Sequence, residues 1–239
     1  MKGTRYSATA LARAANDLFG VLEALSDRFV EVWWSITGGP QPSEFLTSDI
    51  AALRPDVFAA IDANPAFESA GFVLVEGVVA DGPRCLEWWH REPSGDHDRI
   101  GFNLEPGTPD CYDYYNKEWF AAAVSGGSRF VSGPLIDLPC ADVYILTFSQ
   151  PVMANGRLLG VAGADVAVSR FEHRILPPLR NLPRPSLLVN SERRVIASND
   201  ARFTTGEKLP TLPGVDDSWT TVQPVTPDLG WVLASGHHG

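Results

Sequence analysis

Apolar residues near the N-terminus recur with the seven-residue period of an amphipathic helix. Two parallel rows are visible: Leu11, Leu18, Leu25 and Val32, and then Ala15, Leu22, Phe29 and Ile36. This pattern predicts a helix over residues 7–36, which Gly38, Gly39 and Pro40 would end. The apolar stripe fits a helix that lies on the domain's sheet, which we favour because amphipathic helices usually serve a core. A dimer seam is the alternative.

The period then changes from helical to strand-like. Residues 42–65 carry a second helical pattern with proline stops. Residues 71–80 and 84–92 have strand character and are separated by Asp81-Gly82-Pro83, which predicts a hairpin. The sequence of residues 95–109 is polar and contains glycine and proline, which predicts a loop.

Three more strand candidates follow an aromatic stretch and a short helical run. They cover residues 129–137, 142–153 and 156–168, and Asn155-Gly156 joins the last two because both residues tolerate a positive φ. Tight connections favour antiparallel pairing. The sequence thus predicts an α+β fold in which a long N-terminal helix precedes an antiparallel five-stranded sheet.

The C-terminal part reads as a smaller, mostly-β lobe. Residues 169–176 predict a short helix, and the four prolines of residues 177–185 predict a linker. Four short strand candidates come next, at residues 186–190, 194–198, 219–225 and 231–235. We therefore expect one domain over residues 1–176 and an abbreviated second lobe over residues 177–239.

Composition narrows the classes of partner. The formal charge is −10 with no basic run, which argues against nucleic acid and anionic membrane surfaces. Cys85, Cys111 and Cys140 form no CxxC pair, so free thiols and a cytoplasmic location are expected. The alternative is the extracytoplasmic domain of a membrane receptor whose anchors lie outside this sequence.

Signatures of catalysis and of cofactor binding are missing from the sequence. It has no phosphate-binding glycine loop, no GxSxG and no HExxH, so we expect no enzyme activity and no cofactor. His90 and His97 lie near two cysteines, but their spacing matches no zinc pattern, and we expect no metal site. Asp137 and Asp142 are expected to face solvent rather than to act as an acid–base pair.

Four short segments, in order, carry a family resemblance: YDYYNKEWF, SGPLID, FSQPV and LLGVAGADVAV, between Tyr112 and Val168. They resemble the motifs of Cache domains, which are PAS-like, ligand-binding sensor modules of bacterial receptors. The whole layout, a helix before the sheet and a small lobe after it, is similar to the double-Cache type. The resemblance implies a PAS-like sheet and a ligand pocket.

The resemblance also implies which residues bind the ligand. Tyr112 and Trp119 match motif aromatics, and Asp165 matches the aspartate that would hold a ligand ammonium. Three other motif positions have changed: Lys117 stands for an arginine that grips a carboxylate, and Phe120 and Leu135 stand for tyrosines. These changes remove a two-pronged donor and two hydroxyls, so an amine or a short carboxylate becomes as plausible a ligand as an amino acid.

Strand alternation adds three candidates to this site. Trp88 and His90 share one face of their strand, and Thr147 lies on a face that carries small hydroxyls. Each candidate has an ordinary alternative: the rings as core residues, Lys117 as a solvated lysine, and Asp165 as a helix cap.

The expected function is that of a sensor module that binds a small molecule and passes its state to a separate regulator or signalling protein. Two alternatives stay open at this point. One is an enzyme that uses Asp165, His90 and Lys117. The other is a ligand-free dimerisation domain, in which the N-terminal helix forms a homodimer.

Overall fold

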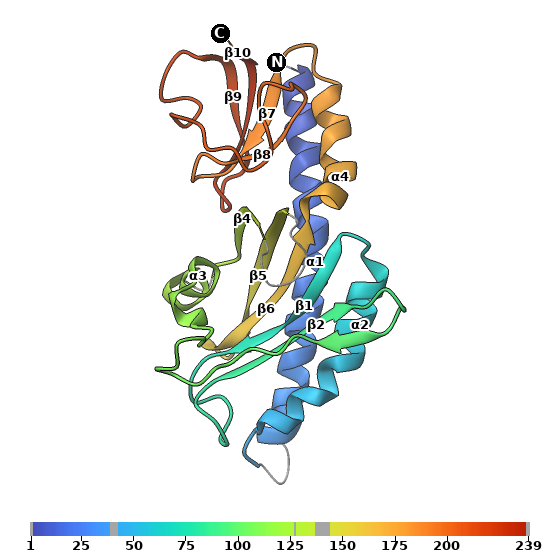
Figure 1. The fold of residues 1–239 in the computed structure, drawn as a ribbon, viewed down its shortest axis with the longest axis vertical. Coiled ribbons are helices and arrows are strands. Elements are labelled where there is room, and N and C mark those ends of the chain that lie inside the picture. The colour runs from blue at the N-terminus through green and yellow to red at the C-terminus, as the bar shows by residue number, and fades with distance from the viewer. Residues whose placement is uncertain (1, 39–42, 127, 137–143, 238–239) are drawn as a thin grey trace. The chain divides into compact units, whose positions relative to one another are not determined.

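A computed structural model gives the fold of residues 2–38, 43–126, 128–136 and 144–237 (Figure 1). The chain divides into two compact units. The helix–sheet unit comprises Phe19–Phe130 and Thr147–Asp165. The terminal unit comprises Met1–Leu18, Val131–Leu146 and Val166–Gly239. The predicted division at residue 176 falls inside a helix of the terminal unit and stays a prediction.

The predicted N-terminal helix is present as α1, Lys2–Thr37. Seven of the eight residues in the two apolar rows are buried, and Ile36 is half-buried. Phe29 packs against Phe72 with ring centroids 5.3 Å apart, and Phe19 packs against Phe148 at 5.1 Å. The apolar stripe therefore serves the core of this chain, as the favoured interpretation predicted. Gly39 and Pro40, proposed as its end, lie outside the described residues.

The second helical pattern forms two consecutive elements, the 3-10 helix η1 (Thr47–Leu53) and the α-helix α2 (Arg54–Ala63). Pro55 occupies the first turn of α2, where its missing N–H costs no helical hydrogen bond. Ile50, Leu53, Val57 and Ile61 are buried, so both elements share one inward face.

The large sheet has six strands in the order β3-β2-β1-β6-β5-β4. Their bounds are β1 Phe67–Leu74, β2 Cys85–Arg91, β3 His97–Arg99, β4 Phe130–Ile136, β5 Tyr144–Ala154 and β6 Arg157–Ala167. The prediction of five strands was one short, because β3 lies in the segment expected to be loop. Three residues are too few to show a period in sequence, and β3 is defined by its antiparallel pairing with β2.

The two faces of this sheet are covered by different elements (Figure 1). Phe72 and Phe148 lie on the face that packs against α1. Their strand neighbours Val73 and Thr147 point to the opposite face, since alternate side chains of a strand do so. That face packs against the 3-10 helix η2 (Tyr114–Asn116) and the helix α3 (Glu118–Gly126), and we call it the α3 face.

The predicted tight turn between β5 and β6 is confirmed. Asn155 and Gly156 adopt φ values of 48° and 77°. Both lie in the left-handed region that a two-residue hairpin turn requires, which is why Asn-Gly is a strong hairpin signal. This turn fixes the register of β6, which carries Asp165.

The C-terminal segment of the terminal unit, Val166–Gly239, contains the four predicted strands and the helix α4. The strands are β7 Ser186–Val189, β8 Val195–Ser198, β9 Trp219–Thr226 and β10 Trp231–His237, in the order β8-β7-β10-β9. The helix α4, Val168–Arg180, runs through Pro177 and Pro178, so the predicted linker was wrong for residues 177–180. Phe171, Ile175 and Leu179 are buried on one side of α4, and this burial offsets the lost backbone hydrogen bonds.

Candidate functional site

The carboxylate of Asp165 lies on the α3 face of β6 and accepts hydrogen bonds from three other strands. Thr147 of β5 donates its hydroxyl to Oδ1 at 2.7 Å. On the other side, Ser69 of β1 donates its hydroxyl to Oδ2 at 2.7 Å, and the Trp88 indole of β2 donates Nε1–H to the same oxygen at 3.0 Å. Three predicted site residues, Trp88, Thr147 and Asp165, are thus brought together. The N-cap of α4 is Ala167, so Asp165 does not hold the cap position.

Trp88 is locked in this arrangement. Its side chain is buried, and its Nε1–H also points to the Ser69 hydroxyl at 2.8 Å. A Cβ atom at Gly163 would lie 2.8 Å from the Trp88 ring, so a glycine is needed where the ring crosses β6. The absence of a side chain at Gly163 therefore lets a strand two positions away reach Asp165.

The aromatic stretch packs against the same face of the sheet. Trp119 and Phe120 are buried in one hydrophobic cluster with Trp88, and Tyr112 packs on its edge. Phe120 meets Tyr114 edge-on, with ring centroids 5.0 Å apart. Trp88 therefore belongs both to the aromatic cluster and to the hydrogen-bonded group at Asp165. The rings supply an apolar wall beside a carboxylate, which is a typical composition for a small-molecule site.

Two of the predicted residues are exposed. Lys117 is exposed, and its ammonium lies 5.4 Å from the centre of the Tyr112 ring, within the range of a cation–π contact. Leu135 belongs to the terminal unit, where 46% of its surface is exposed. The structure therefore places the cationic candidate at the surface of the helix–sheet unit.

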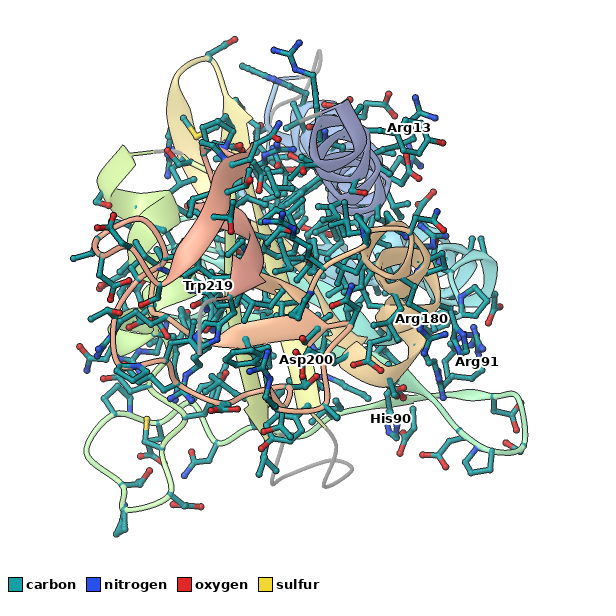
Figure 2. The ribbon with its side chains drawn as sticks, turned by 90° about the horizontal axis from the view of Figure 1, so that it is seen from above. Arg13, His90, Arg91, Arg180, Asp200 and Trp219 are labelled. Atoms are coloured by element: carbon teal, nitrogen blue, oxygen red, sulfur yellow. The ribbon has the colours of Figure 1, made fainter. Side chains whose placement is uncertain are left out.

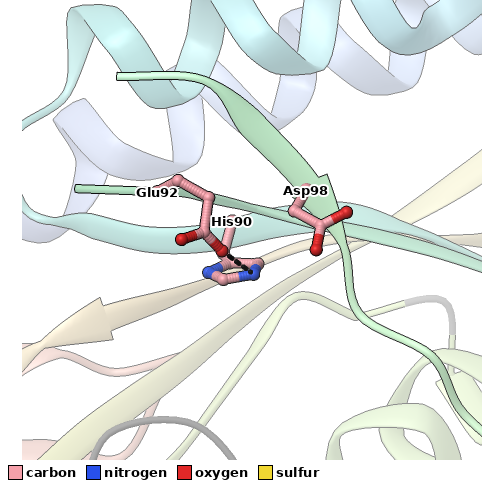
Figure 3. A group of neighbouring side chains, drawn as sticks. All are labelled: His90, Glu92 and Asp98. Atoms are coloured by element: carbon pink, nitrogen blue, oxygen red, sulfur yellow. Dashed lines mark ion pairs between the residues drawn. The ribbon is translucent and has the colours of Figure 1, made fainter. Parts of the chain in front are cut away.

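His90 lies on the α3 face, at the outer end of β2 next to Arg91 (Figure 2). It is the cross-strand partner of Ser69, one of the donors to Asp165. Its Nε2 lies 3.2 Å from the carboxylate of Glu92 (Figure 3). His90 therefore extends the polar part of this face beyond Asp165.

Ser69 is the residue of this group that sequence reasoning missed. It is a buried hydroxyl in β1, followed by residues 70–74, which carry no polar side chain, and a polar residue on a core face needs a hydrogen-bonding partner. A serine at a core-facing position of β1 was therefore the signal in the sequence that could have identified it. Three other residues of interest, Asp137, Cys140 and Asp142, lie outside the described residues.

Burial raises the pKa of two ionisable groups, Tyr114 in the aromatic cluster and Cys85 at the start of β2. Tyr114 is fully buried and donates its hydroxyl to the carbonyl of Leu74 at 3.0 Å. Loss of hydration is the main cause of its raised pKa. The Cys85 thiol is also buried, and its pKa rises from 9.0 to about 12 through desolvation and, less, through the charge of Glu87. Both groups stay protonated and serve packing at neutral pH.

Comparison with known proteins gives one family match. Residues 96–173 match the family model described as the first PDC sensor domain of methyl-accepting-chemotaxis-protein-like proteins. This segment contains the aromatic stretch, β5 and Asp165. No curated protein matches the chain at a significant level.

Several solved structures share the fold. One, described as methyl-accepting chemotaxis protein X, has a TM-score of 0.65 and 13% identity, and covers 98% of this chain and 94% of that chain. The ligand-binding domain of the Pseudomonas aeruginosa amino-acid chemoreceptor PctC, in complex with GABA, has a TM-score of 0.58 and 18% identity over 96% of this chain and 95% of that chain.

A third structure is the extracellular domain of a protein assigned as a histidine kinase. Its TM-score is 0.53 at 16% identity, over 82% of this chain and 69% of that chain. At such identities the likeness establishes the fold. Within the part of the chain that the structure describes, no helix has the length and apolar character needed to cross a membrane. The match over residues 96–173 and the shared fold agree with the predicted resemblance to Cache-type (PDC) sensor domains.

Proposed function

We propose that this chain is a sensory module that binds a small amine-bearing molecule on the α3 face, with Asp165 as the anchor for the ammonium group. The observation that carries the proposal is the Asp165 carboxylate, oriented by Ser69, Trp88 and Thr147 beside an aromatic wall. Ser69, Trp88 and Thr147 orient this carboxylate, and an oriented acceptor binds a ligand cation without first having to be ordered.

The ligand class follows from what surrounds this carboxylate. The wall beside it consists of Trp88, Trp119 and Phe120, which offer apolar surface and few donors. Lys117, which stands where an arginine would grip a carboxylate, is exposed. These features favour a primary amine, or an amino acid whose carboxylate is held weakly. The chemoreceptor domain that was solved with GABA supports an amine-bearing ligand.

Signal transfer and location belong to the same proposal. The chain would pass its ligand-bound state to a separate signalling protein or domain and would leave the ligand chemically unchanged. We place it outside the cytoplasm, the alternative from the sequence, because a similar fold is described as an extracellular domain. Recovery of a chemically altered ligand after incubation would contradict a sensor and favour an enzyme.

A thermal-shift screen against primary amines, amino acids and short carboxylates tests the ligand class. A ligand at 100 times its Kd should add about 2.7 kcal/mol to the free energy of unfolding, which is several degrees in Tm. Amines and amino acids should raise the Tm, whereas simple carboxylates should not. A flat response to all three classes would favour the ligand-free dimerisation domain.

Asp165→Asn then tests the anchor itself. The amide keeps the shape of the side chain, its oxygen can still accept from Trp88, and its NH₂ can donate to the Thr147 hydroxyl. The fold should therefore survive, while affinity for an amine should fall about 10- to 100-fold, because a charge-assisted hydrogen bond is lost. Asp62→Asn is the matched control, since Asp62 is an exposed partner of Arg91 and His97. Equal affinity in both variants would remove Asp165 from the site.

A further inference from the structure

The β2–β3 hairpin gathers three metal-ligating side chains on one face. His90 of β2 is the cross-strand partner of Asp98 of β3, and residues opposite one another in an antiparallel pair point to the same side. Glu92 follows His90 by two positions, and its backbone N–H bonds to the carbonyl of Asp96 at 2.8 Å, which closes the hairpin. The fold of this hairpin therefore brings together one imidazole and two carboxylates.

The distances between these groups are close to those of a coordination sphere (Figure 3). His90 Nε2 lies 3.2 Å from Glu92 Oε1, and the ligand atoms of all three residues lie within 4.8 Å of one another. Ligands bound tetrahedrally to one zinc ion at about 2.0–2.2 Å are about 3.4 Å apart. His90 and Glu92 already satisfy this spacing, and a modest rotation of the exposed Asp98 side chain would complete it.

We propose that His90, Glu92 and Asp98 form a binding site for a divalent transition-metal ion of the zinc type. An imidazole ligand favours such ions over magnesium and calcium, which prefer all-oxygen shells. The two carboxylates balance the double positive charge of the ion. Glu92 and His90 are half-buried and Asp98 is exposed, so the remaining coordination positions stay open to water.

This donor set explains why cysteine and histidine spacing did not predict the site. A search by spacing pairs His90 and His97 with the neighbouring cysteines, Cys85 and Cys111. His97, however, lies on the opposite face of the hairpin, with its Nε2 3.1 Å from Asp62, and Cys85 is buried. The proposed site uses carboxylates in place of these residues, and their positions follow from the pairing of β2 with β3. The proposal does not depend on the sensory function, because it concerns the metal ion alone.

Isothermal titration calorimetry with zinc, after removal of bound metal by a chelator, tests the site. The wild-type chain should bind one zinc ion through the hairpin. His90→Ala and Asp98→Asn should each weaken that binding at least ~10-fold, because each removes a direct ligand. His97→Ala is the matched control: it removes a histidine from the same hairpin that also pairs with a carboxylate, and it should leave zinc affinity unchanged. Circular dichroism checks that each variant is folded.

Cobalt substitution gives a second, independent readout. A cobalt ion at His90, Glu92 and Asp98 should show weak visible bands without the intense near-ultraviolet band of a cobalt–thiolate bond, and Glu92→Gln should change those bands. A thiolate band would place the metal at a cysteine and overturn the proposal. Absence of zinc binding, unchanged binding in His90→Ala, or an equal loss in His97→Ala would overturn it as well.

Discussion

Gly163 decides whether the Trp88 indole can reach Asp165. We expect Gly163→Ala to lower the free energy of unfolding by about 1–3 kcal/mol, the usual cost of forcing an extra methyl into a packed core. The new Cβ would lie 2.8 Å from the buried Trp88 ring and 3.1 Å from the carbonyl oxygen of Phe148, so neither neighbour can yield easily. Urea denaturation measures the loss.

Gly20→Ala is the matched control for this change. Gly20 lies in α1, and a Cβ atom added there would have nothing within 4 Å, so alanine should stabilise the helix by up to about 1 kcal/mol. If both substitutions stabilise the chain, the Trp88 ring does not cross β6 at Gly163, and its bond to Asp165 needs another explanation.

We expect the buried thiol of Cys85 to make the free energy of unfolding fall at alkaline pH. Burial raises the pKa of its thiol from 9.0 to about 12, so the folded chain keeps this proton after the unfolded chain has released it. The stabilising effect is complete below about pH 9 and fades as the pH rises towards 12. Between about pH 8 and about pH 10.5, the wild type should therefore lose more stability in urea denaturation than Cys85→Ala does.

Cys111→Ala serves as the comparison, because Cys111 is only half-buried. It should follow the wild-type pH dependence. If Cys85→Ala also follows it, the Cys85 thiol does not titrate differently in the folded and unfolded chains.

At the residue scale, part of the site could be predicted from sequence. Asp165 was predicted because it matches the aspartate of the motif that the chain resembles, and Thr147 because strand alternation placed it on a hydroxyl-bearing face. The exposure of Lys117 and Leu135 could not be predicted, since it depends on how η2 and β4 are packed. Ser69 was missed because its position signals that it needs a partner, whereas the partner itself is set by strand pairing, which no local pattern contains.

The element that tests the core most directly is α1. Leu18 and Leu25 are 0% and 4% exposed, so replacing both by glutamate would bury two unpaired charges. Each costs several kcal/mol, against a typical total stability of about 5–15 kcal/mol. We expect the double variant to be unfolded by circular dichroism.

Ala24→Glu is the control on the exposed side of the same helix, and it should leave the fold intact. A folded, monomeric Leu18→Glu/Leu25→Glu variant in size-exclusion chromatography would instead support the dimer seam.

Elements differed in how well their patterns predicted them. The seven-residue period of apolar residues along α1 and the Asn155-Gly156 turn were strong local signals, and both elements were confirmed. The short strand β3 depends on pairing with β2, and the last turn of α4 depends on burial of Leu179. Tertiary contacts decided these two elements, and a local pattern cannot contain such contacts.

For the molecule as a whole, the state of the cysteines is the simplest measurable property. The chain contains three cysteines, and the two that the structure describes, Cys85 and Cys111, are free. In denaturant, protein prepared without reductant or added oxidant should react with three equivalents of a thiol reagent. A count of one would show a disulfide and contradict this prediction.

Of the properties of the whole molecule, the fold could be predicted from the sequence and the location could not. The periodicity of apolar residues and the tight-turn signals were enough to predict the α+β fold, and the order of four motifs carried the resemblance to Cache domains, because both are visible without knowing any contact. The location of the chain stays a proposal, since free thiols and charge describe the chain rather than its compartment.

The hydrogen bonds at Asp165 also have a mechanical meaning. One side chain joins four strands, because donors from β1, β2 and β5 converge on a carboxylate of β6. These hydrogen bonds cross-link the four strands and resist sliding of one strand past another. A cation that arrived there would compete with Ser69, Trp88 and Thr147 for the same two oxygens. Occupancy would thus be converted into a change of stiffness across the sheet, without any strand having to move far.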